Sequence, residues 1–344
     1  MHGHPIPGTT LSPSASRSPE VSITLPRRHR PGRLRTSLAP ALLVLLVVAV
    51  APAGAGADGI FVADCSLSHR AANDPIVFHG MPGSSHMHDF FGNRSTDASS
   101  TLRSLRRRAG NCVPADDRSG YWTPTLYRHG RPLKPVQVQV YYQDFFRFGR
   151  VLPFPQGLRV VAGRADAKAP QRGVVRWSCR QDQVGGDPAR IPSCGSTFVA
   201  LRITFPDCWD GRRLDSRNHR SHMAYNRAGG MELGPQRCPR SHPVVVPTLQ
   251  LNVVYPIHDG SGVRLASGHP LTAHADFFNA WSSAVLARRV DDVLNGGKAC
   301  DDFLGCTTIS APNSEPVTAR PKEKLLDRFY RPRTERPHQH HHPR

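Results

Sequence analysis

The chain has 344 residues, enough for one large domain or two ordinary ones, and a formal net charge of +19. Its ends hold part of this charge, +5 on residues 1–57 and +4 on residues 311–344, which leaves about +10 on residues 58–310. A basic core suits anionic polymers such as acidic glycans, wall phosphates or nucleic acid, and it is equally typical of a solvated basic surface. No nucleic-acid-binding motif accompanies the charge, which argues against a sequence-specific nucleic-acid-binding protein.

The first 57 residues have the pattern of a secretory signal peptide. Several arginines precede the apolar stretch 38–50, and small residues follow it in "APAGAGA" (51–57). The apolar stretch is shorter than the roughly 20 residues that a membrane-spanning helix needs. We therefore expect residues 1–57 to be removed, the mature chain to be extracellular, and no membrane span to remain. An uncleaved anchor is the alternative.

Eight cysteines follow the predicted signal peptide: Cys65, Cys112, Cys179, Cys194, Cys208, Cys238, Cys300 and Cys306. An even number of cysteines in an exported chain predicts up to four disulfides. Of about 105 possible connectivities we expect the pairing of nearest neighbours, 65–112, 179–194, 208–238 and 300–306. The chain has no CxxC pair, which argues against a zinc ribbon or a thioredoxin-type site.

Short β-branched runs bounded by Gly and Pro dominate residues 58–310. Strands are predicted at 136–142, 158–163, 174–179, 198–205 and 243–256, the last broken at Pro247. One helix is predicted over 276–295, with Asp276 as its N-cap and Gly296 after its end. We expect a mainly β fold: a disulfide-stapled β-sandwich or jelly-roll-like single domain with long loops and one C-terminal helix. The Pro- and His-rich tail 311–344 is expected to be disordered.

Three stretches concentrate histidine and aspartate. In "HMHD" (86–89) an extended backbone places His86 and His88 on one side, about 6–7 Å apart. In "LDSRNHRSHMAY" (214–225) two histidines lie three residues apart, so a helical turn would give them a shared face. In "SGHPLTAHADFF" (267–278) a histidine and an aspartate repeat the spacing of the first pair. The metal-ligand candidates are His86, His88, His219 and His222, and the catalytic candidates are Asp89, Asp276 and His274.

Convergence of two of these pairs would supply three or four ligands for a divalent metal, with Zn, Cu or Mn as the candidates. Two other interpretations stay open. The same residues can form a metal-free polar cleft in which His and Asp exchange protons, or they can be structural.

Aromatic residues beside Pro and Gly form a second group. "SGYWTPTLY" (119–127) and "FPDCWDG" (205–211) contain rings that could stack on sugars or pack in the core. The substrate-binding candidates from these stretches are Tyr121, Trp122, Trp209 and Asp210.

The order of these motifs is similar to that of the DUF1996 family. It runs "NDPIVFHG…SSHMHDFFGN", "GYWTPTLY", "ITFPDCWDGRRLDS…HRSHMAY…CPRSHPVVVPTL" and "HADFFNAW", from about Asp74 to Cys300. Members are secreted proteins of filamentous fungi and actinobacteria, and fungal members often carry glycan-binding modules. The resemblance implies that the histidines share a site and adds His242 as a substrate-binding candidate. It implies no particular reaction.

These observations favour a secreted protein whose His/Asp cleft binds a divalent metal and engages a cell-wall or extracellular polysaccharide or a similar anionic polymer. Hydrolase or lyase chemistry is expected if the protein is an enzyme. A non-catalytic metal- or glycan-binding wall protein and a secreted metal-dependent nuclease are the alternatives.

Overall fold

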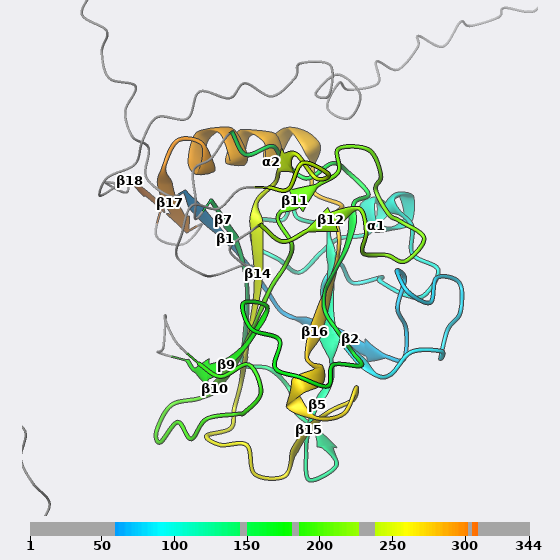
Figure 1. The fold of residues 1–344 in the computed structure, drawn as a ribbon, viewed down its shortest axis with the longest axis vertical. Coiled ribbons are helices and arrows are strands. Elements are labelled where there is room, and N and C mark those ends of the chain that lie inside the picture. The colour runs from blue at the N-terminus through cyan, green and yellow to red at the C-terminus, as the bar shows by residue number, and fades with distance from the viewer. Residues whose placement is uncertain (1–58, 145–149, 181–185, 227–237, 302–304, 309–344) are drawn as a thin grey trace, which may run out of the picture. The chain divides into compact units, whose positions relative to one another are not determined.

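The computed structural model describes residues 59–144, 150–180, 186–226, 238–301 and 305–308 (Figure 1). The chain divides into two compact units, Met1–Ala51 and Pro52–Arg344, and every described residue belongs to the second. The predicted signal peptide and the predicted disordered tail lie outside the described residues. None of the helices in the described ranges is long and apolar enough to cross a membrane.

A seven-stranded sheet forms the larger layer of the second unit. Its order is β18-β17-β1-β7-β14-β10-β9, and all neighbours pair antiparallel except β1 and β17. The strands are β1 (Ile60–Cys65), β7 (Gln137–Gln143), β9 (Val175–Cys179), β10 (Val199–Thr204), β14 (Thr248–Tyr255), β17 (Lys298–Asp301) and β18 (Gly305–Thr308). Every residue of β14 is buried, as expected for a central strand.

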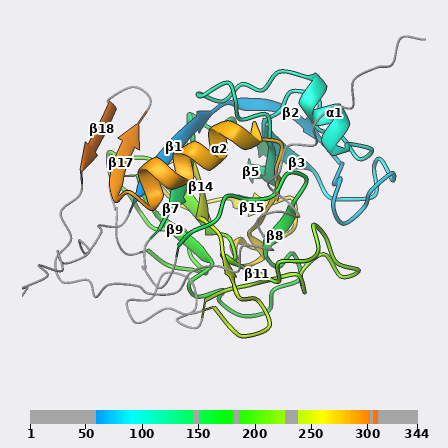
Figure 2. The same cartoon turned by 90° about the horizontal axis from the view of Figure 1, so that it is seen from above.

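A five-stranded antiparallel sheet, in the order β2-β3-β4-β16-β8, forms the second layer. Its strands are β2 (Leu67–Ala71), β3 (His88–Gly92), β4 (Gly120–Pro124), β8 (Arg159–Gly163) and β16 (His274–Phe278). Two three-stranded sheets join β11 (Cys208–Trp209), β12 (Met223–Ala224) and β13 (Val244–Val245), and β5 (Leu126–Arg128), β6 (Arg131–Pro132) and β15 (Val263–Leu265). The helical segments are α1 (Leu102–Arg107), η1 (Pro270–Thr272), α2 (Ser283–Arg289) and η2 (Val290–Leu294), and α2 lies over the end of the sheets near β1 (Figure 2).

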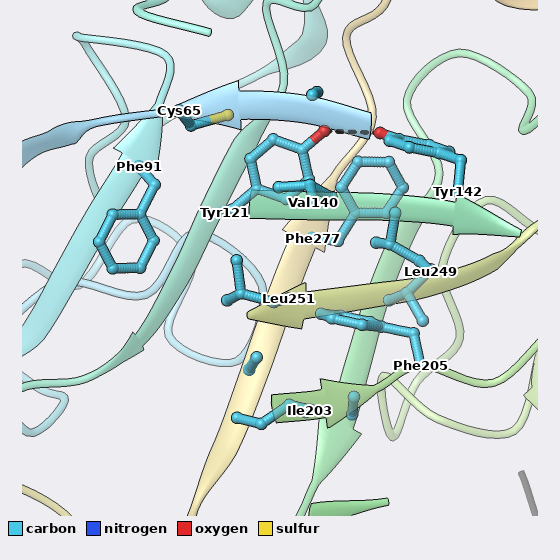
Figure 3. Close-up of a cluster of buried hydrophobic side chains, with 14 of the residues drawn as sticks. Cys65, Phe91, Tyr121, Val140, Tyr142, Ile203, Phe205, Leu249, Leu251 and Phe277 are labelled. Carbon is cyan, nitrogen blue, oxygen red and sulfur yellow. Dashed lines mark hydrogen bonds between the residues drawn. The ribbon is translucent and has the colours of Figure 1, made fainter. Parts of the chain in front are cut away.

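The main hydrophobic core lies between the two larger sheets. Alternate residues of each strand point into it, because successive side chains of a strand face opposite sides. Strands of one sheet run across those of the other, with Leu251 and Tyr142 facing Tyr121, Phe91 and Phe277 (Figure 3). This core leaves the opposite face of the five-stranded sheet to be covered separately.

A smaller hydrophobic cluster covers that opposite face. It contains Phe90 of β3, Trp122 of β4 and Phe278 of β16, with Ile76 and Leu105 packed over them. Residues of the intervening positions on the same three strands, such as Phe91 and Phe277, belong to the main core. The three central strands β3, β4 and β16 are therefore buried along their whole length, and the polar residues in them are buried too.

Four buried polar groups link the core in one chain of hydrogen bonds. Trp281 donates its ring N–H to the Tyr142 hydroxyl at 2.7 Å, and the hydroxyls of Tyr142 and Tyr121 lie 2.6 Å apart (Figure 3). The Tyr121 hydroxyl donates to Asp117 Oδ2 at 2.6 Å, and the backbone N–H of Ser119 donates to Asp117 Oδ1. Burial raises the pKa of Asp117 to about 6, although these hydrogen bonds and the charge of Arg289 oppose the rise.

The raised pKa of Asp117 predicts a pH-dependent loss of stability. A carboxyl whose pKa is higher in the folded state favours folding at low pH, and that contribution is lost as pH rises through about 6. A shift from about 4 to about 6 corresponds to about 3 kcal/mol. Asp117→Asn should remove this pH dependence. Between pH 4 and pH 7, the free energy of unfolding of the variant should therefore rise by about 3 kcal/mol relative to that of the unaltered chain. Urea unfolding across this range checks it, and parallel pH profiles would contradict it.

Among the fully described residues, three of the four predicted disulfides are confirmed: Cys65–Cys112, Cys179–Cys194 and Cys208–Cys238. Cys300 and Cys306 are directly opposite one another in the β17–β18 pair, and the Cys306 side chain lies outside the described part of the structure. The first disulfide ties β1 to the loop before β4.

The predicted mainly β fold with disulfides and one C-terminal helix is confirmed. All five predicted strand regions form strands, and Pro247 separates β13 from β14 as expected. The predicted start of the helix is wrong. Residues 274–278 form β16, because they pair with β4 and β8, and α2 begins only at Ser283 after Ser282 as N-cap. Asp276 is thus a strand residue and caps no helix.

Candidate metal centre

Two strands of the five-stranded sheet bring histidines to the face that the smaller hydrophobic cluster covers. His88 opens β3 and is the register partner of Pro124 in β4. His274 opens β16 and is the register partner of Gly163 in β8. Since Asp276 pairs with Trp122 of β4, His274 lies on the same face as His88, in the row beside the smaller hydrophobic cluster.

His86, just before β3, completes a group of three imidazoles. One ring nitrogen of each of His86, His88 and His274 lies within 4.8 Å of the other two. The Nε2 atoms of His86 and His274 are 3.2 Å apart. Two nitrogens bound at 2.0–2.1 Å to one tetrahedral zinc ion are about 3.3 Å apart, so this separation suits a shared ion.

The backbone fixes the orientation of two of these rings. His88 donates from Nδ1 to the Asn73 carbonyl at 2.9 Å, and His274 donates from Nδ1 to the Thr272 carbonyl at 2.8 Å. In both neutral rings the proton is then on Nδ1, which leaves the lone pair of Nε2 facing the cluster. Metal-binding histidines are commonly held in this way. The buried His88 Nε2 has no hydrogen-bond partner among the described residues.

Two buried carboxyl groups adjoin the histidines. One oxygen each of Asp74 and Asp276 and one nitrogen of His88 lie within 4.8 Å of one another. Asp74 accepts the backbone N–H groups of Ile76 and Val77 at 2.9 and 3.0 Å. Both oxygens of Asp276 are buried without a hydrogen-bond partner in the described part of the chain. An unpartnered buried carboxyl is costly, and a cation is one group that would offset that cost.

Burial sets the protonation of the cluster. It lowers the pKa of His86, lowers the pKa of His88 well below its usual value, and lowers the pKa of His274 to about 3. It raises the pKa of Asp74 and, far more, that of Asp276. The three imidazoles are therefore neutral at neutral pH, which is the form that binds metal.

A third group of ligand-type residues, Cys65, Cys112 and Asp117, also lies close together. Its two sulfurs form a disulfide, so neither is available as a thiolate ligand.

Gly163 makes room for the backbone of β16 at Ala273 and His274. Its φ is +75°, and a Cβ at this position would lie 2.8 Å from the Ala273 carbonyl oxygen and 3.2 Å from His274 Cβ. Only glycine takes this backbone conformation without strain and leaves this space free.

The other predicted histidine pair is not brought into the cluster. His222 is fully buried and bonded at both ring nitrogens, to the Arg159 carbonyl at 2.6 Å and the Ser216 hydroxyl at 3.0 Å. Arg159 pairs with Phe278, four residues along β16 from His274, or about 13 Å of strand. The Nδ1 atom of His219 lies 3.0 Å from the Asp215 carboxylate. The backbone of His219 is in the left-handed region, with a φ of +57°.

Asp89 points away from the histidines. It lies on the opposite face of β3 from His88, where it is fully buried and forms an ion pair with Arg70 and accepts a hydrogen bond from Thr125 at 2.7 Å. Alternation along the strand explains the separation, because adjacent residues face opposite sides of a sheet. The Asp89 carboxylate therefore holds the Arg70 side chain and does not face the histidine cluster.

The three aromatic residues expected to stack on sugars lie in the protein interior. Tyr121, Trp122 and Trp209 are each fully buried, so none presents a ring face to a ligand. Asp210 accepts the backbone N–H groups of residues 212 and 213 and a bond from the Arg213 side chain, which shapes a tight loop. His242 contacts the carbonyl of Ser221 at 3.2 Å and its neighbour Ser241.

Asp74 is a member of the cluster that no motif in the sequence indicates. In "ANDP" it has the appearance of a turn-forming aspartate, and it does accept two backbone N–H groups of the next turn. No spacing relates it to His88 or Asp276, since the sheet alone brings them together.

The architecture and the cluster define a mainly β, disulfide-containing domain with a buried His/Asp group able to hold a metal ion. Residues 74–281 match the model of DUF1996, a domain of unknown function, and the chain belongs to this family. The matched range contains all five residues of the cluster. Neither curated proteins nor solved structures give a match to the chain.

Proposed function

We propose that this chain binds a divalent transition metal, Zn, Cu or Mn, through His86, His88 and His274, and acts outside the cell on a polysaccharide by hydrolysis or lyase chemistry. The observation that carries the proposal is the convergence of three neutral imidazoles whose ligand nitrogens lie within 4.8 Å. Three histidines leave a further coordination position for water or substrate, as catalytic sites do.

Asp276 is the acid–base group of this proposal. It lies beside His88, and its oxygens have no other partner among the described residues. A divalent ion held by these histidines would supply Lewis-acid chemistry, polarising a substrate oxygen or lowering the pKa of a water. Asp276 would accept or return a proton beside it. The backbone carbonyls of Asn73 and Thr272 hold the rings of His88 and His274 in place.

Three disulfides and the signal-peptide pattern of residues 1–57 support action outside the cell. The basic charge of residues 58–310 supports an anionic rather than a neutral polymer.

A substrate screen tests the function. The metal-loaded full chain, Asp276→Asn and His86→Ala are incubated with neutral and acidic polysaccharides, and new reducing ends or unsaturated products are measured. We expect release by the unaltered chain and a loss of at least about 100-fold in Asp276→Asn, the range of general acid–base contributions. His86→Ala should lose activity to a similar extent because it removes a metal ligand. Equal inactivity of all three together with undiminished polysaccharide binding would instead indicate a non-catalytic binding protein.

Gly163→Ala offers a separate test of the ligand arrangement. The added methyl group meets the backbone oxygen of Ala273 and the Cβ of His274, so β16 must shift at the site. We expect about tenfold or greater loss of metal affinity, as for other changes around ligands, and about 1–3 kcal/mol lower stability from the strained conformation. Calorimetric metal titration and urea unfolding measure the two effects.

Gly195→Ala is the matched control for this substitution. Gly195 also has a positive φ, +55°, but a Cβ there has no neighbour within 4 Å. It should lose stability through strain alone and keep its metal affinity. Equal metal affinities for both variants would show that His274 tolerates displacement and would count against its role as a ligand.

A further inference from the structure

A basic pocket opens beside the histidine cluster. It has a volume of about 860 Å³, within the range of ligand pockets. The loop that follows β8, residues 163–174, forms most of its lining, and Arg220 and Tyr225 from the 214–225 stretch complete it.

The pocket and the cluster share structural elements. Gly163 lines the pocket and is the register partner of His274. Gln171, also in the lining, donates from its side chain to the carbonyls of Leu271 and Ala273 at 2.7 and 2.9 Å. The pocket loop is thereby fastened to the segment that leads directly into His274.

Positive charge dominates the lining. Arg164 forms an ion pair at 2.9 Å with Asp166, the only carboxylate among the lining residues. The other three cations, Lys168, Arg172 and Arg220, are exposed and have no carboxylate within salt-bridge distance in the described ranges. The pocket therefore has an excess of three positive charges gathered in one concave surface.

Arg220 joins the lining from the 214–225 stretch, which is fastened to β8 by the 2.6 Å contact of His222 Nε2 with the Arg159 carbonyl. β8 is the strand that pairs with β16, and β16 begins at His274. A ligand anion paired with Arg220 would therefore lie in a pocket that borders the strands of the proposed metal centre.

We propose that this pocket binds the acidic groups of a polysaccharide, carboxylates or sulfates, and holds the chain so that an adjacent sugar reaches the His86–His88–His274 centre. The inference rests on the proposed function and assigns its substrate class, an acidic glycan. Lys168 and Arg172 anchor one acidic sugar, and Arg220 binds a second acidic group of the same chain.

The lining favours a glycan over a nucleic acid. Proteins that bind single-stranded nucleic acid stack bases on aromatic side chains. Tyr225 is the one aromatic residue of the lining, and its hydroxyl is bonded to the Thr204 carbonyl at 3.0 Å. The pocket thus provides cations for acidic groups and no ring positioned as a stacking platform.

Direct binding tests the inference. The full chain, with His338, His340, His341 and His342 replaced by alanine and with zinc added, is titrated calorimetrically with tetragalacturonate. The same oligomer with its carboxyl groups reduced to alcohols is the neutral control, a heparin tetrasaccharide tests sulfate, and an oligothymidylate tests nucleic acid. Zinc content is measured on every sample.

The variants are Arg220→Ala and the double variant Lys168→Ala/Arg172→Ala, with Arg103→Ala/Arg107→Ala on the exposed face of α1 as the matched loss of two charges. We expect each pocket variant to weaken binding of an acidic oligosaccharide about tenfold or more. The reduced oligomer should not bind, and the α1 variant should bind like the unaltered chain. Zinc content should be the same throughout.

Equal weakening by the pocket and α1 variants would overturn the inference in favour of non-specific charge, and pocket-dependent binding of oligothymidylate alone would overturn it in favour of nucleic acid. The metal proposal and the pocket inference can be contradicted separately. If the chain binds zinc but binds none of the acidic oligosaccharides, only the pocket inference is overturned. Pocket-dependent binding of tetragalacturonate in a chain that takes up no zinc removes the metal proposal and leaves the pocket.

Discussion

The His88→Ala variant is expected to lose at least about 100-fold in affinity for zinc. His88 is the residue common to both ligand groups of the cluster, one with His86 and His274 and the other with Asp74 and Asp276. Its fixed tautomer presents Nε2 to the site, so alanine removes a positioned ligand. Changes in residues that merely orient ligands already cost 10–100-fold, and loss of a ligand should exceed that range. Calorimetric zinc titration measures the difference.

His79→Ala is the matched control for this experiment. His79 is an exposed histidine of the loop between β2 and β3, and its Nδ1 contacts the Pro75 carbonyl at 3.2 Å. Both chains need the four tail histidines replaced, because free imidazoles in the tail can bind zinc by themselves. Equal zinc affinity of His79→Ala and His88→Ala, each at the level of the unaltered chain, would contradict the assignment.

Asp276→Val is expected to stabilise the metal-free protein by about 1–3 kcal/mol, the cost of a buried polar group without partners. Both Asp276 oxygens lack hydrogen-bond partners among the described residues, and Trp122 and Val161 flank it in the sheet. A β-branched apolar side chain suits such a position. The same substitution should abolish any activity and reduce the stabilisation that zinc provides, which reaches about 2.7 kcal/mol at 100 times Kd.

Asp207→Val is the matched control because Asp207 is a buried carboxyl that has partners. Asn226 and Thr248 donate to Asp207 Oδ2 at 2.8 and 2.9 Å. Its removal leaves these donors unsatisfied and should destabilise the protein by about 1–3 kcal/mol. Urea unfolding of both variants without metal measures the contrast in sign. A destabilised Asp276→Val would indicate that Asp276 supports the fold rather than a ligand.

The spacing of residues could reveal part of the cluster. The spacing of His86 and His88 predicts a shared side, because alternate residues of an extended segment point the same way, and the structure does place them together. The spacing of His274 and Asp276 predicts the same, and it holds because both lie in β16, although the surrounding sequence favours a helix start. The helical pattern of the following residues concealed the strand.

Tertiary contacts decide which of the other candidate residues belong to the site. His219 and His222 have a spacing equally suited to metal binding, and only the bond from His222 to the Arg159 carbonyl shows that it holds two segments together. Trp122 and Trp209 have sequence neighbours typical of exposed sugar-binding rings. In the structure Trp122 is buried in the smaller hydrophobic cluster and Trp209 in the main core. Burial of this kind depends on residues far away in the sequence, and no local pattern encodes it.

A crystal of the zinc-soaked chain, without its four tail histidines, provides the most direct test of the three-histidine centre. Diffraction data collected on either side of the zinc absorption edge locate the ion. The account predicts one anomalous peak about 2.0–2.1 Å from the Nε2 atoms of His88 and His274 and from a ring nitrogen of His86. A peak elsewhere, such as at His219, with none at the cluster would contradict it.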